Sequence, residues 1–318
     1  MEREKPYYAL DKYLKETFGT KVYKLSLDAG LSCPNRDGKI DTRGCIFCSA
    51  GGSGEFALKI GTPAIGVFDN AIEQMKNAFR EKEHPYIAYF QAFTNTYGDA
   101  DYLREVYTTA LSLEQVAGIS IATRADCITP EVLTLLDNLK NEFPDKFIWV
   151  ELGLQTIHPD SIKYIRRGYD MSCFFQGFQA LQKHKIPTVI HVILGLPNES
   201  TNDMMQTIDY INKLHPFGVK LQLLHVLKGT DLAKDYLDGK FETLSMEEYL
   251  ELVVESICRL REDIVIHRVT GDGPKDITIA PTWCFRKTKT LNTFHHMLWD
   301  RNLSQGCHYT KNDSLQFP

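Results

Sequence analysis

Residues 31–54 read LSCPNRDGKIDTRGCIFCSAGGSG, and this one stretch contains Cys33, Cys45 and Cys48. It is rich in glycine, proline and charged residues and poor in apolar ones, so it cannot organise itself as a hydrophobic core does. Something other than apolar packing must hold it together. Three thiols this close in sequence are typical of a metal centre, and the stretch therefore predicts one.

The spacing of these cysteines favours an iron–sulfur cluster over zinc. Three thiolates in a loop can ligate three corners of a cubane cluster and leave the fourth iron open. A structural zinc ion takes four closed ligands, and the stretch contains no fourth cysteine or histidine. His84 is the nearest candidate and lies far outside the stretch. Zinc remains the alternative interpretation.

The composition describes one large domain, or one domain with an appendage. Of the 318 residues, 43% are apolar, which is enough for a sizeable core. No window approaches the roughly 18 uninterrupted apolar residues of a membrane span, and residues 1–15 lack the apolar centre of a signal peptide. The sequence therefore predicts a cytoplasmic protein. The formal net charge of -5 gives no general basic field, so any nucleic-acid contact requires a local patch.

Short apolar runs alternate with helical stretches over the first 229 residues. Six runs rich in β-branched and aromatic residues predict strands at 22–29, 86–93, 116–123, 147–154, 186–195 and 219–227. Apolar residues at helical spacing predict helices at 68–80, 101–111, 130–143, 160–167, 173–184 and 201–214. This repeated βα order predicts an α/β fold, an incomplete parallel (β/α)6 barrel. Its chemistry is expected at the carboxyl ends of the strands.

The βα order ends after Gly229. Ser245 to Glu248 has the capping-box pattern of a helix that continues to about Arg261. Residues 264–270 read as a strand, and the tail beyond them reads as irregular. We therefore predict a partial barrel over residues 1–229 and an α+β extension, packed on the barrel, over residues 230–318.

Several strings, taken in order with the cysteines, resemble the radical SAM superfamily. The eleven residues between Cys33 and Cys45 depart from that superfamily's commonest spacing and are similar to its Elongator-catalytic-subunit-like branch. Within that branch the chain resembles the YhcC/YtqA-type proteins. The shared strings span about Tyr7 to Leu298 and are CPNRDG, GCIFC, SAGGSGEF, FTNTY, TRAD, ELGLQ, RRG, GLP and HRVTGD.

The resemblance implies a partial TIM-like barrel of the radical SAM type. It also implies a [4Fe-4S] cluster, held by the three cysteines, whose open iron binds S-adenosyl-L-methionine. Reduction by a donor such as flavodoxin or ferredoxin would then generate a deoxyadenosyl radical. The residues expected to bind the cofactor are Gln91, Thr94, Asn95, Thr96, Arg124, Glu151, Gln155, Arg167 and His191.

These positions also have plainer structural interpretations. The polar run after the second strand can satisfy its own backbone in a turn, Arg167 can be a solvated helix-end residue, and His191 can be a core histidine. By contrast, Glu151 and Gln155 share one strand face, where a carboxylate and an amide need polar partners. The remaining cysteines have no CxxC partner and are expected to be mostly small buried hydrophobes. They are Cys127, Cys173, Cys258, Cys284 and Cys307.

The extension is the candidate substrate surface. A basic stretch with an aromatic residue can seat phosphates and stack a base, although a solvated surface around one core tryptophan has the same composition. The candidate substrate residues are Tyr97, His267, Arg268, Asp272, Trp283 and Lys287.

The Elongator-like resemblance implies tRNA as a partner. It also implies conversion of carboxymethylaminomethyl-uridine to aminomethyl-uridine at the wobble position. Two alternatives stay open. One is a radical SAM enzyme for a small metabolite or a protein side chain, which the acidic net charge favours. The other is a non-enzymatic zinc-binding module whose C-terminal patch binds a partner.

Overall fold

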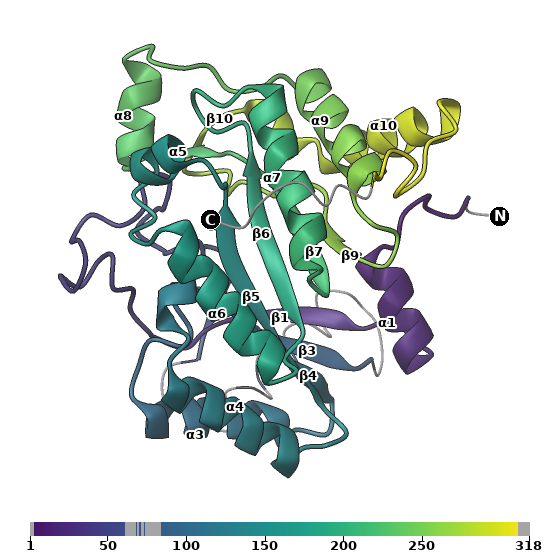
Figure 1. Ribbon diagram of the computed structural model, residues 1–318. Coiled ribbons are helices and arrows are strands. Elements are labelled where there is room, and N and C mark those ends of the chain that lie inside the picture. The colour runs from purple at the N-terminus through teal and green to yellow at the C-terminus, as the bar shows by residue number, and fades with distance from the viewer. Residues whose placement is uncertain (1–2, 61–67, 69, 71–72, 74–83, 311–318) are drawn as a thin grey trace.

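The computed structural model describes residues 3–60, 68, 70, 73 and 84–310. Within them, eight strands form one sheet in which every neighbouring pair is parallel (Figure 1). In spatial order the strands are β2 (Leu58–Lys59), β1 (Tyr23–Asp28), β3 (Tyr86–Phe90), β4 (Val116–Thr123), β5 (Phe147–Gln155), β6 (Thr188–Leu194), β7 (Gly218–Leu223) and β9 (Val265–Arg268). This order confirms the parallel α/β fold predicted from the alternating runs.

Helices cover the outer face of the sheet, as the ribbon shows (Figure 1). They are α3 (Ala100–Leu111), α4 (Pro130–Glu142), α5 (Pro159–Tyr164), α6 (Met171–Lys183) and α7 (Thr201–Leu214). Polar side chains cap several of them; Asp99, for example, accepts hydrogen bonds from two amides of the first turn of α3. The predicted helix at 68–80 lies outside the described residues, apart from three isolated positions.

The sequence predicts one strand over residues 219–227, but the structure divides this run into two strands. Strand β7 ends at Leu223, after a last bond from the Leu224 amide to the carbonyl of Leu194, and residues 224 and 225 belong to no strand. The chain then leaves the sheet and forms β8 (Val226–Leu227), which pairs antiparallel with β10 (Thr278–Ala280). Apolar composition continues across the break, which is why the pattern did not reveal it.

The sequence predicts an irregular tail beyond residue 270. The structure corrects this prediction, because the tail contains a regular helix. It contains α10 (Lys287–Asp300), whose buried residues, Thr290, Phe294 and Leu298, form a single line four residues apart. So narrow a stripe between threonines, histidines and lysines gives little periodic signal. The short helices α1 (Leu10–Phe18) and α8 (Asp231–Leu237) were also not predicted.

The extension contributes directly to the barrel. Helix α9 (Met246–Arg259) begins with the predicted capping box between Ser245 and Glu248. Strand β9 follows it and pairs with β7, so a strand from the extension forms the last edge of the sheet. The division at residue 229/230 stays a prediction.

Apolar side chains fill the amino-terminal end of the barrel. Leu14 of α1, Ile87 of β3 and Trp149 of β5 form a buried cluster there, and Phe147 and Phe217 pack against it. The carboxyl ends of the strands lie at the opposite end of the barrel. Among the described residues, no helix combines the length and the apolar character that a bilayer span requires.

Candidate functional site

A cavity of about 250 Å³ lies at the carboxyl ends of the strands, and we call it the central cavity. Cys33, Cys45 and Cys48 line it, together with side chains from β3, β4, β5, β6, β7 and β9. The loop that carries these cysteines, residues 31–54, follows β1 and is called the cysteine loop. The structure therefore brings the three cysteines together at the end of the barrel where the sequence predicted the chemistry.

Asn35 and Arg36 hold the cysteine loop in place, and neither residue was predicted to have a role. The Asn35 side-chain amide donates to the carbonyls of Arg166 (2.8 Å) and Arg167 (3.1 Å), and it lies 3.5 Å from the Cys45 sulfur. Arg36 donates to the carbonyl of Cys48 (2.8 Å). Their only signal was the CPNRDG string, in which both follow the first cysteine.

The spacing of the three sulfurs fits a cluster better than a single zinc ion. A zinc–sulfur bond of about 2.3 Å places tetrahedral thiolates about 3.8 Å apart. The sulfurs of Cys33, Cys45 and Cys48 do not all lie within 4.8 Å of one another. A cubane cluster places each thiolate on a different iron, and three thiols without a fourth ligand leave one iron open. The donor set therefore fits a [4Fe-4S] cluster.

Burial favours the protonated form of the Cys45 and Cys48 thiols until metal replaces the proton. Burial, reinforced by the neighbouring Cys48, raises the pKa of the Cys45 thiol to about 12. Burial also raises the pKa of Cys48. Loading of the cysteine loop with metal is therefore coupled to proton release.

Gly168 offers a test of the role of Asn35. Its φ of +86° is a conformation that other residues rarely adopt, and a Cβ there would lie 2.5 Å from the Asn35 side-chain oxygen. We expect Gly168→Ala to displace Asn35 and to lower the iron retained after anaerobic reconstitution. The matched control is Gly229→Ala, which shares the left-handed backbone (φ +79°) but has no atom within 4 Å of the added methyl group. Both variants bear a strain of about 1–2 kcal/mol, so equal iron retention in the two would contradict a role for Asn35.

Most of the predicted cofactor residues line the central cavity. They are Gln91, Thr94, Arg124, Glu151, Gln155, Arg167 and His191. Asn95 and Thr96 do not line it, which corrects that part of the prediction. The Asn95 amide donates to the carbonyls of Phe90, Ala92 and Ala122, and Thr96 bonds Thr123 and the carbonyl of Cys127. These two side chains tie the strand ends to one another instead.

The two predicted arginines are buried in the cavity wall. Arg124 makes a two-point ion pair with Asp126 (2.7 and 2.9 Å). Arg167 donates to the carbonyls of Leu154 (2.6 Å) and Thr156 (3.0 Å), so it is not a solvated helix-end residue. Both guanidinium groups lie against the ring of Tyr169, at 4.9 and 4.6 Å from its centroid. Their donors therefore hold the wall, and their contact with a cofactor stays a prediction.

Glu151 is the centre of a buried polar network inside the barrel. Its carboxylate contacts Lys220 directly and accepts hydrogen bonds from Ser120 (2.7 Å) and His191 (2.7 Å). Lys24 lies 3.4 Å away on the other oxygen. Burial opposes ionisation of Glu151, but Lys220 and Lys24 outweigh it and hold the pKa of the carboxyl well below its usual value. Glu151 is therefore ionised at neutral pH.

The ionised carboxylate fixes the tautomer of His191. Burial and the Lys220 charge lower the pKa of His191 to about 4, so the ring is neutral at pH 7. Its Nε2 must carry the proton because that atom faces a carboxylate, and Nδ1 accepts from Gln222 (3.2 Å). His191 is thus a positioned polar residue of the cavity wall. Lys24, Tyr89 and Lys220, which were not among the predicted site residues, complete this network.

Two of the predicted substrate residues, Arg268 and Asp272, line the central cavity. Arg268 is the neighbour of Lys220 across the β7–β9 pair. Within the described part of the chain, its guanidinium group makes no hydrogen bond or ion pair. An open guanidinium fork in a cavity is a receptor for a carboxylate or phosphate.

The other four predicted substrate residues, His267, Trp283, Tyr97 and Lys287, do not line the central cavity. His267 packs against Trp149 (5.4 Å between ring centroids) in the apolar end of the barrel. The Trp283 indole donates to the carbonyl of Leu244 (2.9 Å), which agrees with the alternative interpretation of this residue as a core tryptophan. Tyr97 lies on the outside under Lys39. Lys287 is exposed, but it pairs with Asp272 at the cavity rim.

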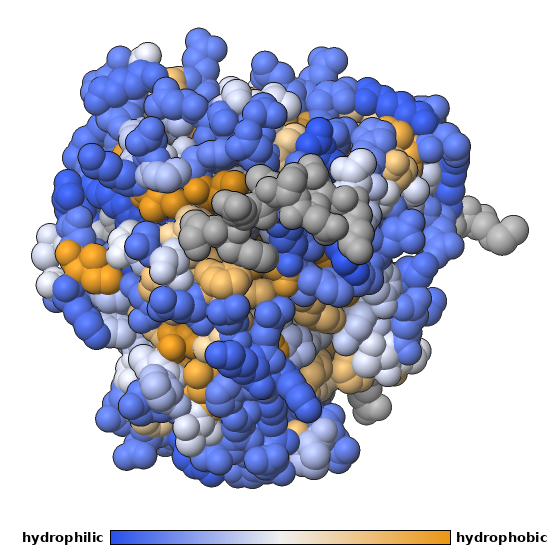
Figure 2. Space-filling model, in the orientation of Figure 1, coloured by the Kyte–Doolittle hydropathy of each residue, from blue (hydrophilic) through white to orange (hydrophobic). Residues whose placement is uncertain are grey.

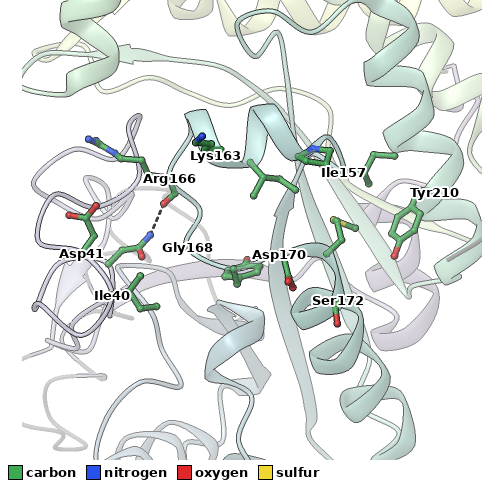
Figure 3. A pocket seen from close by; sticks show the side chains of 14 residues that line it. Ile40, Asp41, Ile157, Lys163, Arg166, Gly168, Asp170, Ser172 and Tyr210 are labelled. Carbon is green, nitrogen blue, oxygen red and sulfur yellow. Dashed lines mark hydrogen bonds between the residues drawn. The ribbon is translucent and has the colours of Figure 1, made fainter. Parts of the chain in front are cut away.

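A larger cavity of about 880 Å³, the outer cavity, lies between the cysteine loop and α5, α6 and α7 (Figure 3). Ile40 and Asp41 come from the loop, and Ile157 and Tyr210 line the other side. Figure 2 shows apolar surface near the centre of this face, surrounded by hydrophilic surface. The three cysteines do not line this cavity, so its size does not make it the site of the chemistry. Tyr169 lines both cavities and separates them.

Comparison with known proteins agrees with this geometry. The Radical SAM superfamily matches residues 42–211, and the Radical_SAM C-terminal domain matches residues 216–300. Protein YtqA of Bacillus subtilis is 42% identical over 305 residues, which cover 95% of this chain and 92% of that protein. Protein YhcC of Escherichia coli is 33% identical over 271 residues, or 85% of each chain.

A solved structure supports the fold. The archaeal Methanocaldococcus infernus Elp3 with an N-terminal deletion superposes with a TM-score of 0.67 at 15% identity, covering 89% of this chain and 64% of that chain. The predicted resemblance and the partial barrel are both confirmed.

Proposed function

From the premise that this chain belongs to the radical SAM superfamily, and is an enzyme of it, we propose that its substrate is tRNA with carboxymethylaminomethyl-uridine at the wobble position. The product would be aminomethyl-uridine. The family implies S-adenosylmethionine and a [4Fe-4S] cluster, which when bound supply the radical that removes a hydrogen atom from the substrate. Because the chain belongs to an enzyme superfamily, it is not the non-enzymatic zinc-binding module that the sequence left open.

The open guanidinium group of Arg268 is the observation that carries this proposal. The substrate group to be removed ends in a carboxylate, and an arginine fork binds a carboxylate at two points. Lys220 lies beside Arg268 across the β7–β9 pair, and Lys24 reaches the same network. Lys220 and Lys24 both contact the carboxylate of Glu151, and Arg268 lines the central cavity without an ion pair among the described residues. The cavity interior therefore suits a substrate group that carries a negative charge.

Exposed basic residues at the rim support a nucleic-acid substrate. Lys287 reaches the rim through Asp272, and Arg286 and Lys289 beside it in sequence are exposed. Such side chains can bind phosphates without reading the base. They provide the local patch that a chain of net charge -5 requires for RNA.

Nucleoside analysis of tRNA tests the proposal. Deleting the gene in its host should raise carboxymethylaminomethyl-uridine and remove the aminomethyl-uridine that derives from it. Returning the wild-type gene should restore the product. In the proposed function the same cavity supplies the radical and binds the carboxylate, so one protein accounts for the conversion. Liquid chromatography with mass spectrometry of digested tRNA measures both nucleosides. Unchanged wobble uridines would contradict the tRNA substrate.

An Arg268→Gln variant separates the substrate from the radical chemistry. Losing a charged hydrogen-bonding partner of about 1.5–3 kcal/mol should slow tRNA conversion roughly 10- to 100-fold. Deoxyadenosine formation without tRNA should persist, since the cysteine loop is untouched. Loss of both activities would indicate that Arg268 binds the cofactor and not the substrate. If deoxyadenosine forms but tRNA is never altered, the alternative of a small-metabolite or protein substrate is favoured.

A further inference from the structure

Two cysteines and a histidine meet beside the end of α9, outside the central cavity. One ligand atom of each of Cys258, Cys307 and His308 lies within 4.8 Å of the other two. Cys258 is buried in the last turn of α9, whereas Cys307 and His308 are exposed. Forty-eight residues separate the two cysteines in the sequence. The group therefore combines a fixed inner thiol with two ligands that solvent can reach.

The backbone holds this group together without help from a metal. The Gly306 amide donates to the carbonyl of Ile257 (3.2 Å), and the His308 amide donates to the carbonyl of Cys258 (2.8 Å). Just before them, the buried Gln305 side chain donates to the carbonyls of Arg261 (2.6 Å) and Ile264 (2.8 Å). The loop that carries Cys307 and His308 is thus fixed against the end of α9. Its ligands need little reordering to close on an ion.

Glu255 orients the imidazole. Its carboxylate lies 3.0 Å from Nδ1 of His308. Glu255 also precedes Cys258 by three residues, so the two share a face of α9. Histidines that bind metals usually bond a carboxylate through their other ring nitrogen, which fixes the ring and makes the ligand more basic. Arg259 in turn holds the second oxygen of Glu255 at 2.6 Å.

We propose that Cys258, Cys307 and His308 bind one thiophilic divalent cation of the zinc class, separate from the cysteine loop. Two thiolates and an imidazole are three ligands of a zinc tetrahedron, and water can take the fourth position. Zinc requires its thiolates about 3.8 Å apart, which a group within 4.8 Å reaches by a small contraction. In the cysteine loop at least one pair of sulfurs lies more than 4.8 Å apart, so those three thiols are less suited to a single zinc ion.

This site corrects the expectation for two of the five remaining cysteines. Cys258 and Cys307 were expected to be isolated small hydrophobes, but folding brings their sulfurs together. A bound cation would tie the segment around Cys307 to α9 and stabilise that attachment. A disulfide between the two thiols is the competing state, in which an oxidant takes two electrons and two protons are released. It would remove both sulfur ligands.

Cobalt(II) is the probe that reports the ligands. The full-length variant with Cys33, Cys45 and Cys48 changed to alanine removes the cluster ligands, and it is titrated anaerobically with Co(II) and then Zn(II). We expect one Co(II) per chain, thiolate charge-transfer and tetrahedral absorption bands, and displacement by Zn(II). Cys307→Ser should abolish these bands, and Glu255→Gln should weaken binding about 10- to 100-fold. Cys173→Ser, an isolated cysteine elsewhere, is the matched control and should leave the bands unchanged.

A second measurement covers the case in which the cluster-free variant does not fold. Elemental analysis of the otherwise intact protein, reconstituted with iron and sulfide and then given zinc, should show one zinc per chain. Cys307→Ser should lose that zinc and keep its iron. The proposal is overturned if no thiolate band appears and no zinc is retained, or if Cys307→Ser binds metal as the parent does. Mass spectrometry showing a Cys258–Cys307 disulfide in anaerobically purified protein would also overturn it.

Discussion

Replacing Cys33, Cys45 and Cys48 together with alanine is expected to reduce deoxyadenosine formation to the level of a control without enzyme. The three thiols line the central cavity and form a donor set that fits a cluster better than a single zinc ion. Without them no iron is held at the carboxyl ends of the strands. The measurement is anaerobic reconstitution with iron and sulfide, followed by incubation with S-adenosylmethionine and a strong reductant.

The control for this result is Cys173→Ala, which removes a half-buried thiol that does not line the central cavity. It should retain iron and deoxyadenosine formation. Iron and sulfide contents are measured for every variant, so loss of activity with the cluster still present would assign the cysteines another role. Iron bound equally well without the three thiols would contradict the cluster assignment.

Glu151→Ala is expected to destabilise the fold severely. It leaves Lys220, 2% exposed, buried without its counter-charge, which costs about 3–5 kcal/mol. The folded pKa of Glu151 lies below the unfolded value, so its ionised form stabilises the fold at neutral pH. That contribution is lost as the pH falls through the folded pKa. Anaerobic thermal unfolding should show a drop in Tm on the order of 10 °C.

Two further variants sharpen this test. Glu251→Ala breaks an exposed ion pair with Arg301 and should cost below about 1 kcal/mol. Glu151→Met combined with Lys220→Met should recover part of the loss, because Lys220 no longer remains as a buried unpaired charge, whereas Lys24, 23% exposed, still loses its partner. If Glu151→Ala were as mild as Glu251→Ala, Lys220 would be uncharged in the folded protein and would need no partner.

Local pattern was enough to predict the barrel. The strands and most of the outer helices repeat their apolar spacing within a few residues, and Ser245 and Glu248 carry their cap in the sequence itself. The cysteine loop was also visible, because its ligands lie within one short stretch. These features depend on neighbours along the chain, which a sequence displays directly.

The remaining features depend on contacts between distant segments. The sequence singles out Glu151, but it shows Lys220 and Lys24 only as members of predicted strands, and the register of the sheet decides that the three meet. Asn95 resembles a cofactor ligand in the FTNTY string, yet its side-chain nitrogen donates to carbonyls at two strand ends and the residue does not line the central cavity. Cys258 and Cys307 carry no spacing signal. Pattern shows which residues are polar, whereas topology decides what each one faces.

Strand β9 and the cysteine loop come from opposite ends of the chain, and both contribute to the wall of the central cavity. The cysteine loop follows β1, the first long strand, while Arg268, which we propose as the substrate-binding residue, lies on β9, the last strand of the sheet, and both line the central cavity. The wall of the reaction chamber is complete only when both ends are folded together. A substitution in the final third of the chain can therefore alter the wall of the central cavity without touching the cysteine loop.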